Sequence, residues 1–202
     1  MTTTATTATS QRAAALYDSA YARKYRAHDD EFESSRPCVE FAEWLRGLCE
    51  HASSPMDVLD LGCGTGRYFW ALSKVRSLVG LDVSAPMLAE ARTPYRASEL
   101  QVTNIELVEG DLLADHFGPG RFDLVYSIGV LAEHAPLDEG VVARVGGWLR
   151  PGGRFAFTTV HPESASIPRT PGRRVGEWLA HLPLGPMKPA LRQRLLSGGM
   201  YA

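Results

Sequence analysis

The stretch "VLDLGCGTGRY", Val58 to Tyr68, decides the fold class because a short apolar run leads directly into three closely spaced glycines. The run "VLDL" predicts a buried strand, and Gly62, Gly64 and Gly66 predict a tight turn whose bare backbone a ligand can approach. We expect "RYFWALSK" to start a helix behind the turn, where unpaired N–H groups and a partial positive charge are available. The stretch therefore indicates a site for a nucleotide-like ligand.

Short apolar runs alternate with amphipathic stretches on both sides of this turn. The runs predict strands at 57–62, 77–83, 105–111, 122–128 and 154–160. The amphipathic stretches predict helices near 66–75, 85–97 and 137–149, and two more helices within 11–49. Repeated alternation of strand and helix predicts an α/β fold with a doubly wound, mostly parallel sheet.

The local composition of the chain divides it into three parts. Residues 1–14 are rich in threonine and predict a disordered tail. Residues 15–160 predict a ligand-binding core, in which residues 15–50 form a helical cap. Residues 161–202 are rich in proline and arginine and predict a lid-like segment followed by a C-terminal helix.

The composition excludes several classes of protein. The chain has 202 residues, a net charge of −2 and three cysteines without the spacing of a disulfide framework or a metal site, so no metal is predicted. It contains no membrane-spanning apolar run and no secretory signal, which predicts a cytoplasmic protein without a membrane partner. Residues 161–202 carry six Lys or Arg against two acids, but these charges are scattered, so we predict no nucleic-acid partner.

Three acids follow the predicted strand ends and narrow the choice of ligand. The spacing G-x-G-x-G differs from the dinucleotide fingerprint G-x-G-x-x-G, and Asp60 just before it favours a cationic group over a pyrophosphate. Asp82 ends the next strand, where a carboxylate can accept hydrogen bonds from both ribose hydroxyls. Asp111 closes the third strand and can accept from an adenine amino group. These acids suit a ligand with a ribose, an exocyclic amine and a positive centre.

With these features the chain resembles a class I S-adenosylmethionine-dependent methyltransferase, with a Rossmann-like fold. The resemblance rests on "VLDLGCGTG", "VGLDVSAPMLAEAR", "VEGDLL", "FDLVYSIGVL" and "LRPGGRFAF", which occur in the family's order between residues 57 and 160. It implies that the cofactor is S-adenosylmethionine and that the chain is an enzyme of class EC 2.1.1.-, which methylates a small-molecule O, N or C acceptor.

The resemblance also implies a set of cofactor-binding residues, each with a separate part of the ligand. They are Asp60 and the backbone of Gly62, Cys63 and Gly64 for the methionine portion; Asp82 for the ribose; Val83 and Met87 for the adenine; Asp111 and the Leu112 N–H for the adenine edge; Ser127 and Ile128 beneath the sulfonium; and Tyr17 and Tyr25 over the carboxylate. For the two tyrosines, aromatic core packing at helical spacing is an equal alternative.

The methyl group on a sulfonium is already activated, so the protein has chiefly to align and desolvate the acceptor. A hydroxyl acceptor would benefit from a base, and the candidate catalytic residues are His134 after the fourth strand and His161 after the fifth. A surface or lid hydrogen bond is the alternative for both. "GVLAEHA" places its histidine one residue later than the commonest family pattern, which leaves the alignment of Glu133 and His134 open.

The chain departs from the family after the fifth strand. The family's sheet has seven strands, and residues 161–202 carry no strand signal, so the last two strands are missing either because the domain ends early or because the chain is a fragment. A fifth strand left as an edge would favour a homodimer. The alternative to an enzyme is a non-catalytic S-adenosylmethionine-binding subunit, or a truncated methyltransferase.

Overall fold

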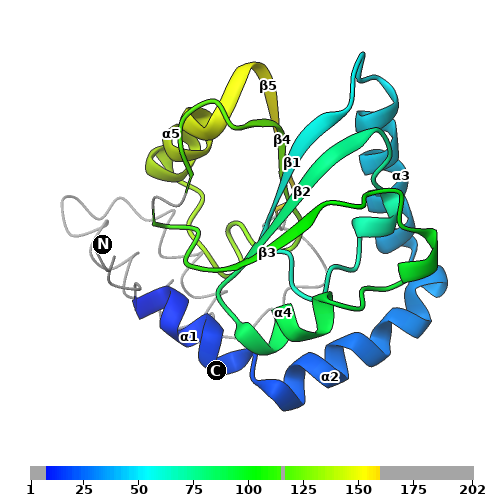
Figure 1. Ribbon diagram of the computed structural model, residues 1–202. Helices are drawn as coiled ribbons and strands as arrows, with labels where there is room; N and C mark the ends of the chain where they lie inside the picture. Colours follow the sequence, from blue (N-terminus) through cyan, green and yellow to red (C-terminus); the bar gives the residue numbers. More distant parts are fainter. Residues whose placement is uncertain (1–7, 115–116, 160–202) are drawn as a thin grey trace, which may run out of the picture. The chain divides into compact units, whose positions relative to one another are not determined.

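A five-stranded parallel sheet forms the centre of the computed structural model, which describes residues 8–114 and 117–159 (Figure 1). Its strands are β1 (Met56–Leu61), β2 (Val75–Asp82), β3 (Ile105–Glu109), β4 (Phe122–Ser127) and β5 (Leu149–Phe157). They lie in the order β3-β2-β1-β4-β5, and every neighbouring pair is parallel. The order reverses between β1 and β4, and α/β sheets bind ligands at such a reversal. The predicted α/β fold is confirmed.

Helices cover both faces of the sheet, because alternate residues of each strand point to opposite faces. Val58 packs with Leu45 of α3 (Arg36–Glu50) and with Leu88 of α4 (Ala85–Ala91). Its neighbour Leu59 packs in a second cluster with Val145 of α5 (Glu139–Trp148). Figure 1 shows α5 and α3 on opposite sides of the sheet. Two separate apolar layers therefore stabilise the sheet.

The prediction of a helix at 66–75 is wrong. The chain there makes turns and one short 3-10 helix, η2 (Phe69–Ala71), in which N–H groups bond three residues back, as from Phe69 to the Gly66 carbonyl. Gly66 has φ +71°, and a Cβ on it would lie 2.8 Å from the Phe69 ring, so the aromatic side chain packs against bare backbone. Strand β2 already starts at Val75, directly after these turns.

Two further element boundaries differ from the predicted ones. Helix α4 ends at Ala91 instead of residue 97, because Pro94 disfavours helical backbone just before it, and the short 3-10 helix η3 (Ala97–Glu99) follows. Strand β5 begins at Leu149 instead of residue 154, since Leu149 already pairs with Phe122 before an irregular turn. The pairing resumes at Arg154.

The predicted disordered tail of residues 1–14 is wrong for residues 8–14, which belong to α1 (Ala8–Leu16). The sequence of α1, "ATSQRAAAL", is rich in alanine, the best helix former, and this outweighs the effect of its polar residues. The cap continues through α2 (Ser19–Ala27), the 3-10 helix η1 (His28–Ser34) and α3. The predicted lid, C-terminal helix and missing strands of residues 161–202 lie outside the described residues.

A buried ion pair attaches the cap to the glycine turn. The Asp29 carboxylate is fully buried and accepts hydrogen bonds from Arg67 Nε at 2.5 Å and from Arg26 Nη1 at 2.7 Å. Arg67 follows the last glycine of the turn, and its guanidinium lies 4.2 Å from the ring centroid of Tyr25. The two cations therefore share one buried anion, which fixes α2 and η1 against the turn.

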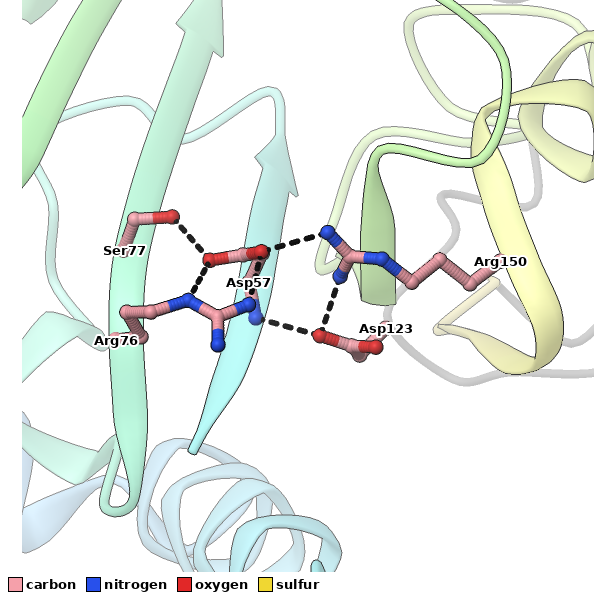
Figure 2. Close-up of polar contacts among 5 residues, drawn as sticks. All are labelled: Asp57, Arg76, Ser77, Asp123 and Arg150. Atoms are coloured by element: carbon pink, nitrogen blue, oxygen red, sulfur yellow. Dashed lines mark hydrogen bonds and ion pairs between the residues drawn. The ribbon is translucent and has the colours of Figure 1, made fainter. Parts of the chain in front are cut away.

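A second polar network joins the amino ends of four strands (Figure 2). Asp57 of β1 accepts hydrogen bonds from Arg76 and Ser77 of β2 on one side and from Arg150 of β5 on the other. Asp123 of β4 accepts from Arg150 at 2.6 Å and from the Asp57 N–H at 2.8 Å. These contacts lie at the sheet edge opposite the strand ends that carry the predicted site.

Candidate functional site

A pocket opens at the carboxyl ends of the strands, where the strand order reverses. Its walls come from the glycine turn, the turns after β2 and β3, the loop after β4 and the start of the cap. Eleven of the predicted site residues line it: Tyr17, Tyr25, Gly62, Gly64, Asp82, Val83, Met87, Asp111, Leu112, Ile128 and His134. The topology thus brings together residues that are up to 117 positions apart in the sequence.

The glycine turn presents backbone to the pocket. Gly62 has φ +84° and Gly64 has φ +55°, both in the left-handed region that residues with a Cβ adopt at a cost. A Cβ on Gly62 would lie 2.5 Å from Val130 Cγ2, and a Cβ on Gly64 would lie 3.3 Å from Met87 Cε. The turn therefore needs glycine at both positions. At Gly62 a side chain would clash with Val130, and at Gly64 the backbone conformation favours glycine.

Asp82 holds the glycine turn in place from the end of β2. Its Oδ2 accepts from the Gly64 N–H at 2.8 Å, and its Oδ1 accepts from the Ser84 N–H at 2.9 Å. Burial raises the pKa of Asp82, and the backbone donors lower it. The two carboxylate oxygens have about four lone-pair sites between them, more than the backbone donors use. Asp82 can therefore fix the turn and still accept a hydrogen bond from a ligand hydroxyl.

Asp111 lies across the pocket, after β3. The carboxylate is buried, and its Oδ1 accepts from the Leu113 N–H at 2.8 Å, which shapes the turn "GDLL". Leu112, between the two, lines the pocket. Asp111 and Leu112 thus both line the pocket, and their contact with the edge of an adenine ring stays a prediction.

Three predicted residues lie beneath the pocket and do not line it. Ser127 is fully buried, and its Oγ donates to the Leu61 carbonyl at 2.7 Å, which joins the ends of β4 and β1. Cys63 is buried against Gly80 of β2, where a Cβ would lie 2.9 Å from its Sγ. Burial raises the pKa of the Asp60 carboxyl to about 8, and the nearby charge of Asp82 adds to the effect. These side chains support the pocket floor from below.

His134 reaches the pocket from a tight loop after β4. The N–H groups of His134 and Ala135 both donate to the Val130 carbonyl, at 2.8 and 3.1 Å. The Nε2 atom of His134 lies 2.8 Å from the Tyr17 hydroxyl oxygen. Of the two candidate bases, the structure therefore places His134 in the pocket, while His161 lies outside the described residues. Glu133 does not belong to the described pocket lining.

Sequence reasoning missed six residues of the pocket wall: Ala13, Leu81, Gly110, Gly129, Val130 and Ala135. Most are small or apolar and carry no chemical signal of their own. Gly129 is the exception, because it lies two residues past β4 and has φ +70°. A glycine directly after a strand end was a signal that could have been used.

The described residues form neither a cluster of metal ligands nor a membrane-spanning helix. Within residues 8–114 and 117–159, no three His, Cys, Asp or Glu side chains cluster as metal ligands would. No helix in the same ranges has the length and apolar character needed to cross a membrane.

Comparisons with known proteins identify the family of this chain. A family model described as a methyltransferase domain matches residues 58–153. The aklanonic acid methyltransferase DauC of Streptomyces sp. (strain C5) is 33% identical over 168 residues, which are 77% of this chain and 74% of that protein. A ubiquinone biosynthesis O-methyltransferase of Thiobacillus denitrificans is 38% identical over 111 residues, 54% of this chain and 46% of that protein. The chain thus spans less than half of the second relative.

A solved structure supports the fold. A protein from Methanococcus maripaludis, assigned to the S-adenosylmethionine-dependent methyltransferases, has a TM-score of 0.56 over 78% of this chain and 66% of its own, at 20% identity. Together with the relative that matches over most of its length, the parallel sheet and the glycine turn place the chain. It belongs to the class I S-adenosylmethionine-dependent methyltransferases, and S-adenosylmethionine is its cofactor.

Proposed function

We propose that the chain transfers a methyl group from S-adenosylmethionine to a small-molecule acceptor. The observation that carries the proposal is Asp82, which faces the pocket with spare lone pairs while it holds the bare backbone of Gly64. The names of the two relatives support the acceptor class, since one methylates aklanonic acid and the other is an O-methyltransferase of ubiquinone biosynthesis.

The residues present fit the cofactor part by part. Asp82 would accept from the ribose hydroxyls, and the backbone of Gly62, Cys63 and Gly64 would lie against the methionine portion, with Asp60 below it. Val83 and Met87 would line the adenine, with its edge at Asp111 and Leu112. Tyr17 and Tyr25 would cover the carboxylate, and Ile128, supported by Ser127, would lie beneath the reacting centre. When bound, the cofactor supplies an activated methyl group on a positively charged sulfur.

The charge of the pocket suits the positive centre of the cofactor. Asp82 and Asp111 line the pocket, and the described part of its wall includes no Lys or Arg. Such a wall attracts a cation. His134 lines the described pocket, and an imidazole can act as a base, so we assign His134 as the group that takes the proton of a hydroxyl. His161 keeps its predicted role as an alternative base.

Calorimetric titration with S-adenosylmethionine and S-adenosylhomocysteine tests the donor site. Asp82→Ala removes hydrogen bonds to a charged acceptor, which contribute about 1.5–3 kcal/mol each, so affinity should fall at least about tenfold. Glu109→Ala is a matched control, because Glu109 pairs in register with Asp82 at the same sheet edge, is exposed and is absent from the described pocket lining. Equal affinities for Asp82→Ala and the unsubstituted chain would contradict the ribose assignment.

A screen of phenols, amines and carboxylates for S-adenosylhomocysteine formation then tests the reaction. We expect turnover of at least one phenol, because His134 can take the proton of a hydroxyl. Tight cofactor binding without turnover of any acceptor would instead support the alternative function, a non-catalytic cofactor-binding subunit. The predicted homodimer, cytoplasmic location and lack of a nucleic-acid partner stay predictions, and light scattering that shows only monomer would remove the first.

A further inference from the structure

A hydrogen bond crosses the pocket between two parts of the chain that are far apart in sequence. Tyr17 lies between α1 and α2, and His134 lies in the loop after β4. The Tyr17 hydroxyl oxygen is 2.8 Å from His134 Nε2, and the two rings meet edge to face, with centroids 5.4 Å apart and planes at 80°. Both side chains line the pocket, so a ligand meets them together.

The backbone of Tyr17 is fixed by the turn that carries Asp82. Its carbonyl accepts a hydrogen bond from Ser84 Oγ at 2.6 Å. Ser84 is buried, its N–H donates to Asp82 Oδ1 at 2.9 Å, and its Oγ also accepts from the Met87 N–H at 3.2 Å. Separate hydrogen bonds thus connect the turn of Asp82 to the backbone of Tyr17 and the side chain of Tyr17 to His134.

We propose that Tyr17 is a positioning residue, whose hydroxyl oxygen accepts the Nε2–H of His134 and leaves the Nδ1 lone pair free to take a proton. This proposal rests on the proposed function, and it identifies the methyl acceptor as a hydroxyl compound. In the step, the acceptor proton passes to His134 Nδ1 while the acceptor oxygen bonds to the methyl carbon. The methyl–sulfur bond breaks, and its electron pair stays on sulfur.

This direction of the hydrogen bond is the one that survives proton transfer. A neutral imidazole has one N–H and one free lone pair, whereas an imidazolium has two N–H groups and no lone pair. A Tyr17 oxygen that accepts from Nε2–H can do so before and after Nδ1 takes a proton. If Tyr17 donated to Nε2 instead, Nδ1 would carry the proton, and that bond would have to break during the reaction.

The surroundings of Tyr17 keep its own proton in place. Burial raises the pKa of Tyr17, and the nearby Tyr21, Tyr25, Asp82 and Glu133 raise it further. Tyr17 therefore stays neutral and does not act as the base. Because its oxygen accepts from His134, its O–H remains available to donate, which agrees with its proposed contact to the carboxylate of the cofactor. One hydroxyl would then serve both the cofactor and the base.

Nitrogen NMR of the full chain labelled with ¹⁵N-histidine tests the pair without an acceptor. The chain has six histidines, and His134→Gln identifies the signal of His134. We expect the Nε2–H form, with a ring proton on Nε2 that is protected from exchange with water. Tyr17→Phe should abolish that protection, because the acceptor oxygen is gone while the ring remains. An Nδ1–H form in the unsubstituted chain, or unchanged protection in Tyr17→Phe, would overturn the proposal.

Tyr21→Phe is the matched control. Tyr21 lies in α2, and its ring meets that of Tyr17 edge to face with centroids 5.0 Å apart, so Tyr21→Phe reports the effect of losing a neighbouring hydroxyl. Protection of the His134 proton should persist in this variant. With any phenol that the screen finds, Tyr17→Phe should lower kcat about tenfold and leave the KM of the phenol within about twofold, as expected when one hydrogen bond acts mainly in the transition state. A screen without turnover would refute the proposed function, whereas the NMR result tests the Tyr17 contact separately.

Discussion

Asp57→Asn tests what holds the amino ends of the strands together, because the Asp57 carboxylate is the centre of the network in Figure 2. A hydrogen bond to a charged group contributes about 1.5–3 kcal/mol when it is buried, and this range suits the 2.7 Å contact with Ser77. The side chains of Arg76 and Arg150 are 59% and 34% exposed, so solvent weakens both ion pairs relative to the Ser77 contact. Asparagine keeps one acceptor oxygen, so we expect a loss of about 2–3 kcal/mol.

Urea unfolding followed by tryptophan fluorescence measures this loss at pH 7. In thermal unfolding, the same loss should lower Tm by roughly 4–12 °C, given about 2–4 °C per kcal/mol for a chain of this size. Glu106→Gln is the control, since it removes an ion pair with Arg121 in which both side chains are largely exposed. The control should change stability by less than about 1 kcal/mol.

The pH dependence gives a second test of the same network. Arg76 beside Asp57, helped by Ser77 and Arg150, holds the pKa of Asp57 well below its usual range, against the opposing effect of burial. A carboxylate whose pKa is lower in the folded state stabilises the fold above the unfolded value, about 3.9, and loses that contribution as the pH falls below it. The difference between Asp57→Asn and the unsubstituted chain should stay constant from about pH 7 to 5 and narrow below about pH 4. Equal stability at pH 7, or a difference that widens in acid, would refute the reasoning.

Two further predictions concern the floor of the pocket. Gly62→Ala should destabilise the fold by about 2–4 kcal/mol in thermal unfolding, because its Cβ would lie 2.5 Å from Val130 Cγ2 at a φ of +84°. Gly47→Ala in α3 is the control. Its Cβ would meet nothing within 4 Å, so this variant should be neutral or stabilising in the same assay. Burial raises the pKa of Asp60 to about 8, so the folded chain keeps a proton that the unfolded chain has lost, and stability should fall as pH rises from about 4 to 8. Asp60→Asn should therefore gain stability relative to the unsubstituted chain between pH 5 and 8 without cofactor, and a difference independent of pH in urea unfolding would contradict this.

Local patterns in the sequence predicted the sheet and the pocket edge that it carries. Each strand is a short apolar run, and the acids and glycines lie at the ends of the runs or just after them, so their positions relative to the sheet edge are fixed within a few residues. Asp82 and Gly64 lie 18 residues apart and still meet at 2.8 Å, because two adjacent parallel strands end at the same edge. Strand geometry alone carries that part of the site.

Contacts that depend on tertiary packing could not be predicted in this way. The segment after the glycine turn has a helical pattern of residues, but the packing of Phe69 against Gly66 and the early start of β2 override it. The contact of Tyr17 with His134 depends on how the cap folds back over the sheet, which no local pattern encodes. The hydrogen bond from the Ser127 hydroxyl to the Leu61 carbonyl joins two strand ends and likewise has no local signal in the sequence.

The buried Asp29 makes the cap inseparable from the sheet. Arg67, whose side chain is only 15% exposed, has its carboxylate partner 38 residues earlier in the chain. Removing residues before α3, or exchanging them for the helices of another methyltransferase without an equivalent acid, would leave this cation without its anion. An exchange of the cap helices between methyltransferases should therefore include Arg67, so that the cation and its anion are transferred together.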